Sequence, residues 1–162
     1  MATRARVLIA VAFSMGLMLG VAAITGVQST AGQPPTAKRA VRPGKAPNTG
    51  LPYSPGILAG NTLYVSGHLG RDPVTAKLVA GGIEAETTQS LANIREVLRG
   101  AGMDFKDVVS VTAYIASFDD FAKFNAVYRE TFPADPPARA TVQVAALNEH
   151  ARIELQMLAV KP

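Results

Sequence analysis

The stretch RIELQMLAV, residues 152–160, constrains the fold more than any other part of the chain. Its odd-numbered positions are all apolar, whereas its even-numbered positions begin polar (Arg152, Glu154, Gln156) and end aliphatic. A period of two is typical of a β-strand with one face packed against a core. The mixed second face predicts a sheet whose other side is also covered, and we expect oligomer formation through that side.

Two segments predict helices. Residues 83–102, IEAETTQSLANIREVLRGAG, repeat apolar side chains at three- and four-residue spacing. Residues 117–132 begin with Ser117 and carry an acid three residues later, which is a capping-box signature. The remaining apolar runs predict strands, in the order strand, strand, helix, strand, helix, strand, strand. We therefore expect an α+β fold in which both helices pack on one face of an open mixed sheet.

The first two predicted strands flank Gly60-Asn61, a turn dipeptide at hairpin spacing. The second of these strands is expected to end at Ser66-Gly67.

The N-terminus predicts export. Two arginines and no acid precede Val7–Val27, a run without any charge. This pattern is typical of a signal peptide, which we place at residues 1–31. The same run is long enough to cross a hydrocarbon core of ~30 Å if it is not cleaved. We expect a periplasmic or secreted protein, or one anchored to the outer face of the inner membrane through residues 7–27.

Residues 32–49 are rich in proline, glycine, alanine and basic side chains, and they offer little to bury. They predict a flexible tether, which leaves residues 50–162 as the folded domain. All twelve acidic residues but only ten of the sixteen basic ones lie in that domain, so its formal charge is −2 although the whole chain carries +4. Nucleic-acid binders present a clustered basic face, and nucleic acid is therefore not an expected partner.

The chain has no cysteine, which excludes thiol catalysis and disulfides. Its two histidines, His68 and His150, lie far apart in the sequence, so no metal site is expected. We interpret both as ordinary surface or hydrogen-bonded histidines.

The domain resembles a known family. PPAR, ATVQVAAL and, five residues later, IEL are similar to the C-terminal signature of the RidA (YjgF-type) reactive-intermediate deaminases. GLPYSPG resembles the Gly-x-Pro-Tyr opening of that family, and LYVSGHLG resembles its strand ending in Ser-Gly. QSLANIREVLRGAG and FAKFNAVYRETF have counterparts in its two helices. The resemblance covers residues 50–162 and leaves out the leader and the tether.

The resemblance implies a chorismate-mutase-like fold assembled as a homotrimer, with clefts between subunits. It implies hydrolysis of reactive enamines and imines of the 2-aminoacrylate type to 2-keto acids and ammonia, as in a 2-iminobutanoate/2-iminopropanoate deaminase. No cofactor or metal is implied. Because the leader predicts a location away from cytosolic enzymes that release 2-aminoacrylate, the physiological substrate stays open.

Two catalytic residues follow from the resemblance. Arg139 matches the arginine that grips the substrate carboxylate, a task suited to a planar guanidinium with two parallel donors. Glu154 matches the glutamate that orients or activates the attacking water. Apart from the resemblance, Arg139 could be a structural ion-pair partner of Glu154 or of a neighbouring subunit, and Glu154 could be a charge at the rim of an assembly.

Four further residues are implied to bind substrate. Tyr53 matches the tyrosine that closes over the bound acid, although a tyrosine in a loop often only packs. Ser66 and Gly67 match the strand end that lines the cleft. Asn125 matches a helix asparagine near the site, and it could instead serve to bridge backbone groups.

Two other functions remain open. A non-catalytic module would use Arg139 to bind small carboxylic acids without hydrolysing them. Endoribonuclease activity, the third alternative, is disfavoured by the acidic domain.

Overall fold

The computed structural model describes residues 37–43 and 52–162. In chain order the elements are β1 Lys38–Val41, β2 Gly56–Ala59, β3 Thr62–Leu69, α1 Gly82–Gly100, the 3₁₀ helix η1 Phe105–Asp107, β4 Val108–Ile115, the 3₁₀ helix η2 Phe118–Asp120, α2 Phe121–Thr131, β5 Ala138–Gln143, the 3₁₀ helix η3 Asn148–His150 and β6 Ile153–Val160. The predicted leader, with its candidate anchor at residues 7–27, lies outside these ranges. None of the helices within them has the length and apolar character needed to span a bilayer.

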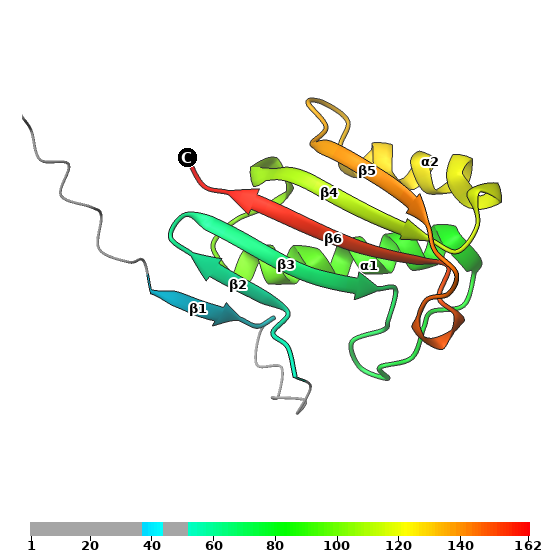
Figure 1. Ribbon diagram of the computed structural model, residues 1–162, viewed down its shortest axis with the longest axis horizontal. Coiled ribbons are helices and arrows are strands. Elements are labelled where there is room, and N and C mark those ends of the chain that lie inside the picture. The colour runs from blue at the N-terminus through cyan, green and yellow to red at the C-terminus, as the bar shows by residue number, and fades with distance from the viewer. Residues whose placement is uncertain (1–36, 44–51) are drawn as a thin grey trace, which may run out of the picture. The chain divides into compact units, whose positions relative to one another are not determined.

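The six strands form one sheet in the order β1-β2-β3-β6-β4-β5 (Figure 1). Neighbouring strands are antiparallel except β4 and β5, which run parallel. The strand with the clearest alternation, β6, lies inside the sheet between β3 and β4. Its residues Ile153, Leu155 and Met157 are buried, as the period of two predicts. The expected α+β class with a mixed sheet is confirmed.

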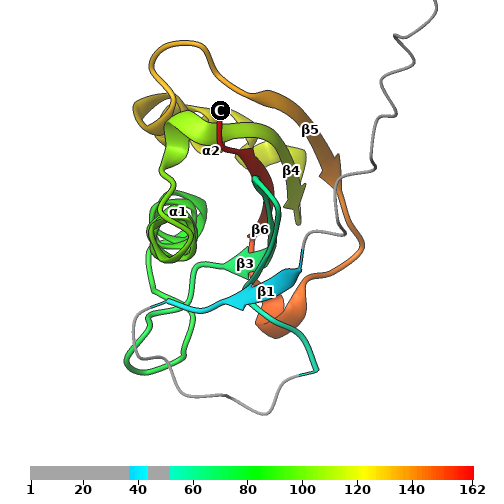
Figure 2. The same ribbon diagram turned by 90° about the vertical axis from the view of Figure 1, so that its left-hand side faces the viewer.

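Both helices cover the same face of the sheet (Figure 2). The stripe predicted for α1 is buried, with Ile94 and Leu98 fully inaccessible. From α2, Phe124 and Tyr128 enter the same core. The core therefore lies between one sheet face and two helices, and no helix within residues 37–43 and 52–162 covers the other sheet face.

The start of α2 differs from the prediction. The hydroxyl of Ser117 accepts a hydrogen bond from the backbone N–H of Asp119 at 3.1 Å, but it caps η2, and α2 begins later. The acid expected to complete a capping box, Asp120, is buried and binds Arg152 instead. The capping-box prediction is wrong because this carboxylate has a stronger, charged partner.

The tether prediction is wrong for residues 38–41, which form β1 and pair with β2. Its one large apolar residue, Val41, is 1% exposed. A methyl group placed on Gly100 would lie 3.0 Å from the Val41 side chain, so the glycine at the end of α1 permits this close packing. A four-residue strand with one apolar side chain has too little pattern to be recognised among prolines and basic residues.

The predicted end of the second strand is also corrected, because β3 continues to Leu69. The register with β6 shifts between Val65 and His68, which places a β-bulge at Ser66-Gly67. A bulge bends the strand and redirects its side chains without ending the pairing.

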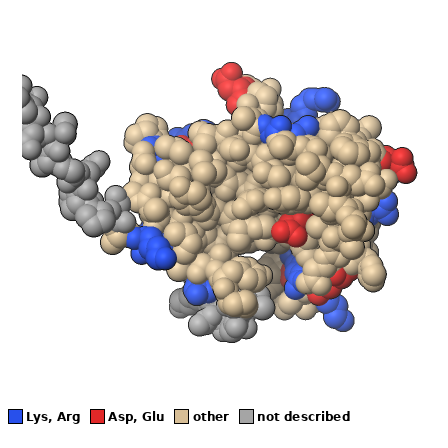
Figure 3. Space-filling view, in the orientation of Figure 1, with Lys and Arg blue, Asp and Glu red and all other residues tan. Residues whose placement is uncertain are grey.

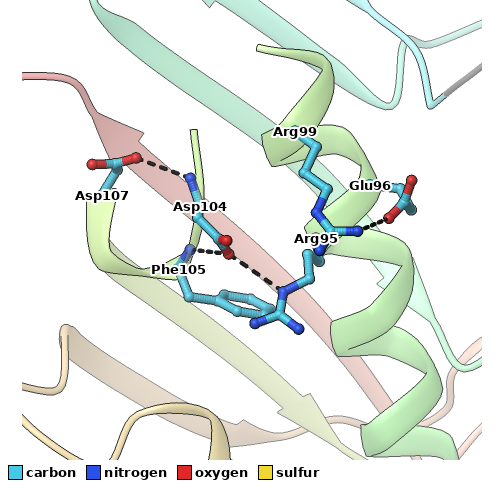
Figure 4. Close-up of polar contacts among 6 residues, drawn as sticks. All are labelled: Arg95, Glu96, Arg99, Asp104, Phe105 and Asp107. Carbon is cyan, nitrogen blue, oxygen red and sulfur yellow. Dashed lines mark hydrogen bonds and ion pairs between the residues drawn. The ribbon is translucent and has the colours of Figure 1, made fainter. Parts of the chain in front are cut away.

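A polar cluster fixes the turn from α1 into β4 (Figure 4). The carboxylate of Asp104 accepts from the backbone N–H of Phe105 at 2.8 Å, and that of Asp107 accepts from the N–H of Asp104 at 2.9 Å. Arg95 lies 3.3 Å from the Asp104 carboxylate and stacks over the Phe105 ring at 5.0 Å. The hydrogen bond from Phe105, more than the charge of Arg95, holds the pKa of Asp104 below its usual value.

The sheet face opposite the helices is broad and nearly free of charge over its middle (Figure 3). Large side chains such as Tyr64 and Val142 are about half exposed there. The expectation that a second copy of the chain covers this face stays a prediction.

Candidate functional site

A cavity of about 510 Å³ opens where β3, β6 and the loops around them meet. The segment before β2 contributes Tyr53 and Pro55, and the bulge and end of β3 contribute Ser66 to Leu69. The rest of the wall comes from the loop after β3 and from α1, η3 and β6, through the residues Arg71, Asn93, Asn148 and Glu154. The structure thus brings four of the six predicted site residues to one cavity: Tyr53, Ser66, Gly67 and Glu154.

Glu154 lies against the backbone of the β-bulge. A methyl group placed on Gly67 would lie 2.7 Å from Cδ of Glu154 and closer still to its Oε1. Only glycine therefore leaves room for the carboxylate in this position. The bulge and the missing side chain together hold a carboxylate at the wall of the cavity.

The start of β6 is anchored two residues before Glu154. The backbone N–H of Arg152 donates to the buried carboxylate of Glu86 on α1 at 2.8 Å. The guanidinium of Arg152 binds the Asp120 carboxylate through Nε at 2.8 Å and Nη2 at 2.7 Å. These contacts connect the strand that carries Glu154 to α1 and to η2, so the carboxylate is held by a rigid support.

Ser66 holds the segment that carries Tyr53. Its backbone N–H and its hydroxyl both donate to the carbonyl of Pro55, at 3.0 and 3.1 Å. The Tyr53 side chain remains exposed at the cavity edge, where the residue is 55% accessible. A tyrosine in this position can close over a bound molecule.

Arg139 and Asn125 do not line this cavity. Arg139 lies on β5 opposite Val111, a core residue that faces the helices. Glu154 lies opposite Tyr114, between two fully buried neighbours that face the helices, and so it points to the opposite side of the sheet. Within one subunit the two residues therefore cannot form the ion pair that the sequence left open.

Arg139 is held in a defined position at the edge of the sheet. Its Nη2 donates to the side-chain oxygen of Asn125 at 2.7 Å, and its guanidinium stacks on Tyr128 at 4.4 Å and on Phe124 at 4.9 Å. Burial raises the pKa of Tyr128 to about 12, and the nearby positive charge of Arg139 opposes that shift. The aromatic shelf and the amide preorganise one guanidinium for an anion.

His68 is not the ordinary histidine that the sequence suggested. It lines the cavity, and its buried Nε2 has no hydrogen-bond partner in the part of the chain that the structure describes. Burial lowers its pKa, an effect partly offset by the carbonyl of Pro55. The imidazole is therefore neutral near pH 7.

Sequence reasoning also missed Arg71, Asn93 and Asn148. His68 immediately follows the recognised Ser-Gly pair, and Arg71 comes two residues after the end of β3, so the continuation of β3 past the bulge was the available signal. Asn93 lies on the polar side of α1. Its side-chain amide donates to the carbonyls of Leu69 and Arg71 at 3.2 and 2.8 Å, which places it at the cavity wall. Over residues 37–43 and 52–162, no group of three acidic or histidine side chains is placed to hold a metal ion.

The family described as Endoribonuclease L-PSP matches residues 43–161. The chain belongs to this family. One similar relative, from Capra hircus, is named 2-iminobutanoate/2-iminopropanoate deaminase and is 44% identical over 76% of this chain and 90% of its own length. The predicted resemblance to the RidA deaminases is confirmed.

Solved structures of the family have the same fold. RidA from the Antarctic bacterium Psychrobacter sp. is 35% identical, with a TM-score of 0.71 over 76% of this chain and 99% of its own. TdcF of E. coli, solved with bound serine, is 29% identical, with a TM-score of 0.71 over the same shares of the two chains.

Proposed function

We propose that the cavity beside Glu154 is the active site of an imine deaminase and that Arg139 of a second copy of the chain completes it. Relatives 41–44% identical over 90% of their length are named 2-iminobutanoate/2-iminopropanoate deaminase. Hydrolytic deamination of reactive enamine and imine intermediates is accordingly the activity of this chain. The observation that carries the site is the Glu154 carboxylate held against Gly67 in the cavity.

The chemistry needs one water and one proton acceptor. Water adds to the electrophilic C=N carbon while the Glu154 carboxylate accepts a proton from it. The carboxylate passes this proton to the nitrogen, which gives a carbinolamine. It then transfers the proton of the new hydroxyl to the nitrogen, and the C–N bond breaks to release ammonia as the C=O bond of the 2-keto acid forms. Such a carbon already reacts with water, so orientation of water and substrate supplies much of the rate increase.

The substrate carboxylate needs a cation, and Arg139 is the residue that the family signature assigns to it. In one subunit Arg139 lies on β5, the edge strand, on the sheet face opposite to that of Glu154. A second copy covering the open face would bring its edge strand and Arg139 toward the cavity. The homotrimer implied by the resemblance is the assembly that we propose.

Location is a separate proposal. We retain export to the periplasm or medium, or anchoring through residues 7–27, on the strength of two arginines followed by an uncharged run. Mass spectrometry of the N-terminus from the native host distinguishes a cleaved leader from an intact anchor. Recovery of the intact leader in a fraction extracted without detergent would contradict both forms of this proposal.

The test of function is hydrolysis of imines generated in place from amino acids by an amino-acid oxidase, with the full chain, Arg139→Met and Glu154→Gln. Wild type is expected to accelerate ammonia release, and each substitution to reduce kcat/KM at least about tenfold because it removes a charge from the site. A non-catalytic binding module would bind 2-oxobutanoate without accelerating hydrolysis. RNA cleavage that persists in Arg139→Met protein would mark a contaminating ribonuclease and not an activity of this site.

A further inference from the structure

Arg71 brings a positive charge to the wall of the cavity, and the reaction described above does not use it. It follows β3 directly, two residues after Leu69, whose Cα partner on β6 is Glu154. The residue lines the cavity, and its side chain is 35% exposed. Its backbone is fixed, because its carbonyl accepts from Asn93 on α1 at 2.8 Å and the residue bridges to Leu78.

Among the described residues the guanidinium of Arg71 has one counter-ion, and that contact is exchangeable. Its Nη2 lies 3.1 Å from Oε1 of Glu149, whose side chain is 44% exposed. Ion pairs this open to water are weak, so a carboxylate entering the cavity can compete for the guanidinium.

The backbone at Glu149 has an uncommon conformation. Glu149 and His150 both have a φ of 58° in η3, in the left-handed region that non-glycine residues rarely adopt. The preceding residue, Asn148, lines the cavity. The carboxylate that now pairs with Arg71 therefore lies in a turn of uncommon backbone conformation, next to a residue of the cavity wall.

In one subunit the cavity has room for more than a three- or four-carbon acid. Its volume of about 510 Å³ falls in the range of pockets that enclose drug-sized ligands. Asn93 and Asn148 complete the wall near Arg71, and the Asn93 amide already donates to the carbonyls of Leu69 and Arg71. Arg71 therefore supplies the charge on this part of the wall.

We propose that Arg71 binds a second carboxylate, carried on the side chain of the substrate, so that the site accepts imines of dicarboxylic amino acids. The proposal rests on the proposed function and names its substrate class. Arg139 of the second copy would hold the carboxylate next to the imine carbon, and Arg71 the distal one. Lysine would serve less well, because the guanidinium fork can bind a carboxylate through two hydrogen bonds.

The test compares binding of two product acids, 2-oxoglutarate and 2-oxobutanoate, to the full chain by calorimetry. The variants are Arg71→Met, Glu149→Gln and, as a control, Arg99→Met, which removes an arginine from a more exposed ion pair outside the cavity. Wild type is expected to prefer 2-oxoglutarate. In Arg71→Met the ratio of the two Kd values should shift about tenfold against 2-oxoglutarate, in keeping with loss of a charged hydrogen bond.

The other two variants are expected to differ in their effect on 2-oxoglutarate binding. Glu149→Gln removes the competing carboxylate and should strengthen 2-oxoglutarate binding several-fold, whereas Arg99→Met should match wild type. If both acids bind equally more weakly to Arg71→Met, Arg71 binds the first carboxylate and the inference is overturned. Affinities for both acids equal to those of wild type would also overturn it. Calorimetry measures binding and does not depend on hydrolysis. Absence of imine hydrolysis would therefore contradict the proposed function without contradicting the role of Arg71.

Discussion

The carboxylate of Glu154 lies so close to the backbone of Gly67 that no side chain fits between them. One residue comes from β6 and the other from the bulge in β3, so the sheet register places the candidate base. The position of Glu154 is thus a property of the fold and not of a flexible loop.

Gly67→Ala should therefore disable the enzyme with only a moderate loss of stability. The new methyl group would push the Glu154 carboxylate away from the cavity wall, so we expect kcat to fall at least about tenfold and the free energy of unfolding to fall by about 1–3 kcal/mol. The measurements are steady-state kinetics and denaturant unfolding of the full chain. Gly82→Ala is the control, since its methyl group would meet no atom within 4 Å and only its φ of 73° is strained. Full activity in Gly67→Ala would contradict this role of the glycine.

Asn125→Ala should weaken substrate binding by loosening Arg139. The Asn125 amide accepts a 2.7 Å hydrogen bond from the Arg139 guanidinium. Without it, the guanidinium would be held only by its stacking on the aromatic rings. We expect KM to rise about tenfold, in line with a hydrogen bond to a charged group, and kcat to change less. Lys123→Ala, an exposed change on the same helix, is the control. A fall in kcat at constant KM would argue that Asn125 acts on the reaction and not on Arg139.

The fold was largely accessible from the sequence, but the site was accessible only in part. The alternation in β6 and the stripe in α1 identified the core correctly, because periodicity depends on local spacing. Which face Arg139 and Glu154 occupy depends on how β4 and β5 pair, and no local pattern specifies that register. The resemblance supplied the two residues, and the sheet shows that one subunit does not bring them together.

His68→Gln should make the protein less sensitive to acid. Because burial lowers the pKa of His68, the unfolded chain binds more protons below pH 6.5, and stability falls as the pH drops through the folded pKa. We expect wild type to lose more stability than His68→Gln between pH 7 and pH 5. Chemical unfolding across this range measures the difference, and parallel curves would show that the buried imidazole does not contribute.

Tyr128→Phe should stabilise the protein slightly and reduce its loss of stability in alkali. The buried hydroxyl has no hydrogen-bond partner among the residues that the structure describes, so its removal should add up to about 1 kcal/mol to the free energy of unfolding. With a folded pKa of about 12 against an ordinary value of 10.0, Tyr128 favours folding below pH 10, and this contribution is lost as the pH rises toward 12. Urea unfolding of both proteins at pH 8 and pH 11 checks both effects. A destabilised Tyr128→Phe protein would imply a partner for the hydroxyl in the assembly.

Mixing two inactive variants tests the shared site most directly. Glu154→Gln and Arg139→Met chains are unfolded together at equal concentration and refolded, and hybrid assemblies are verified by native mass spectrometry. If each site takes Glu154 from one chain and Arg139 from another, random assembly should restore about a quarter of wild-type imine hydrolysis. Hybrids that remain as inactive as the separate variants would contradict a site built from two copies.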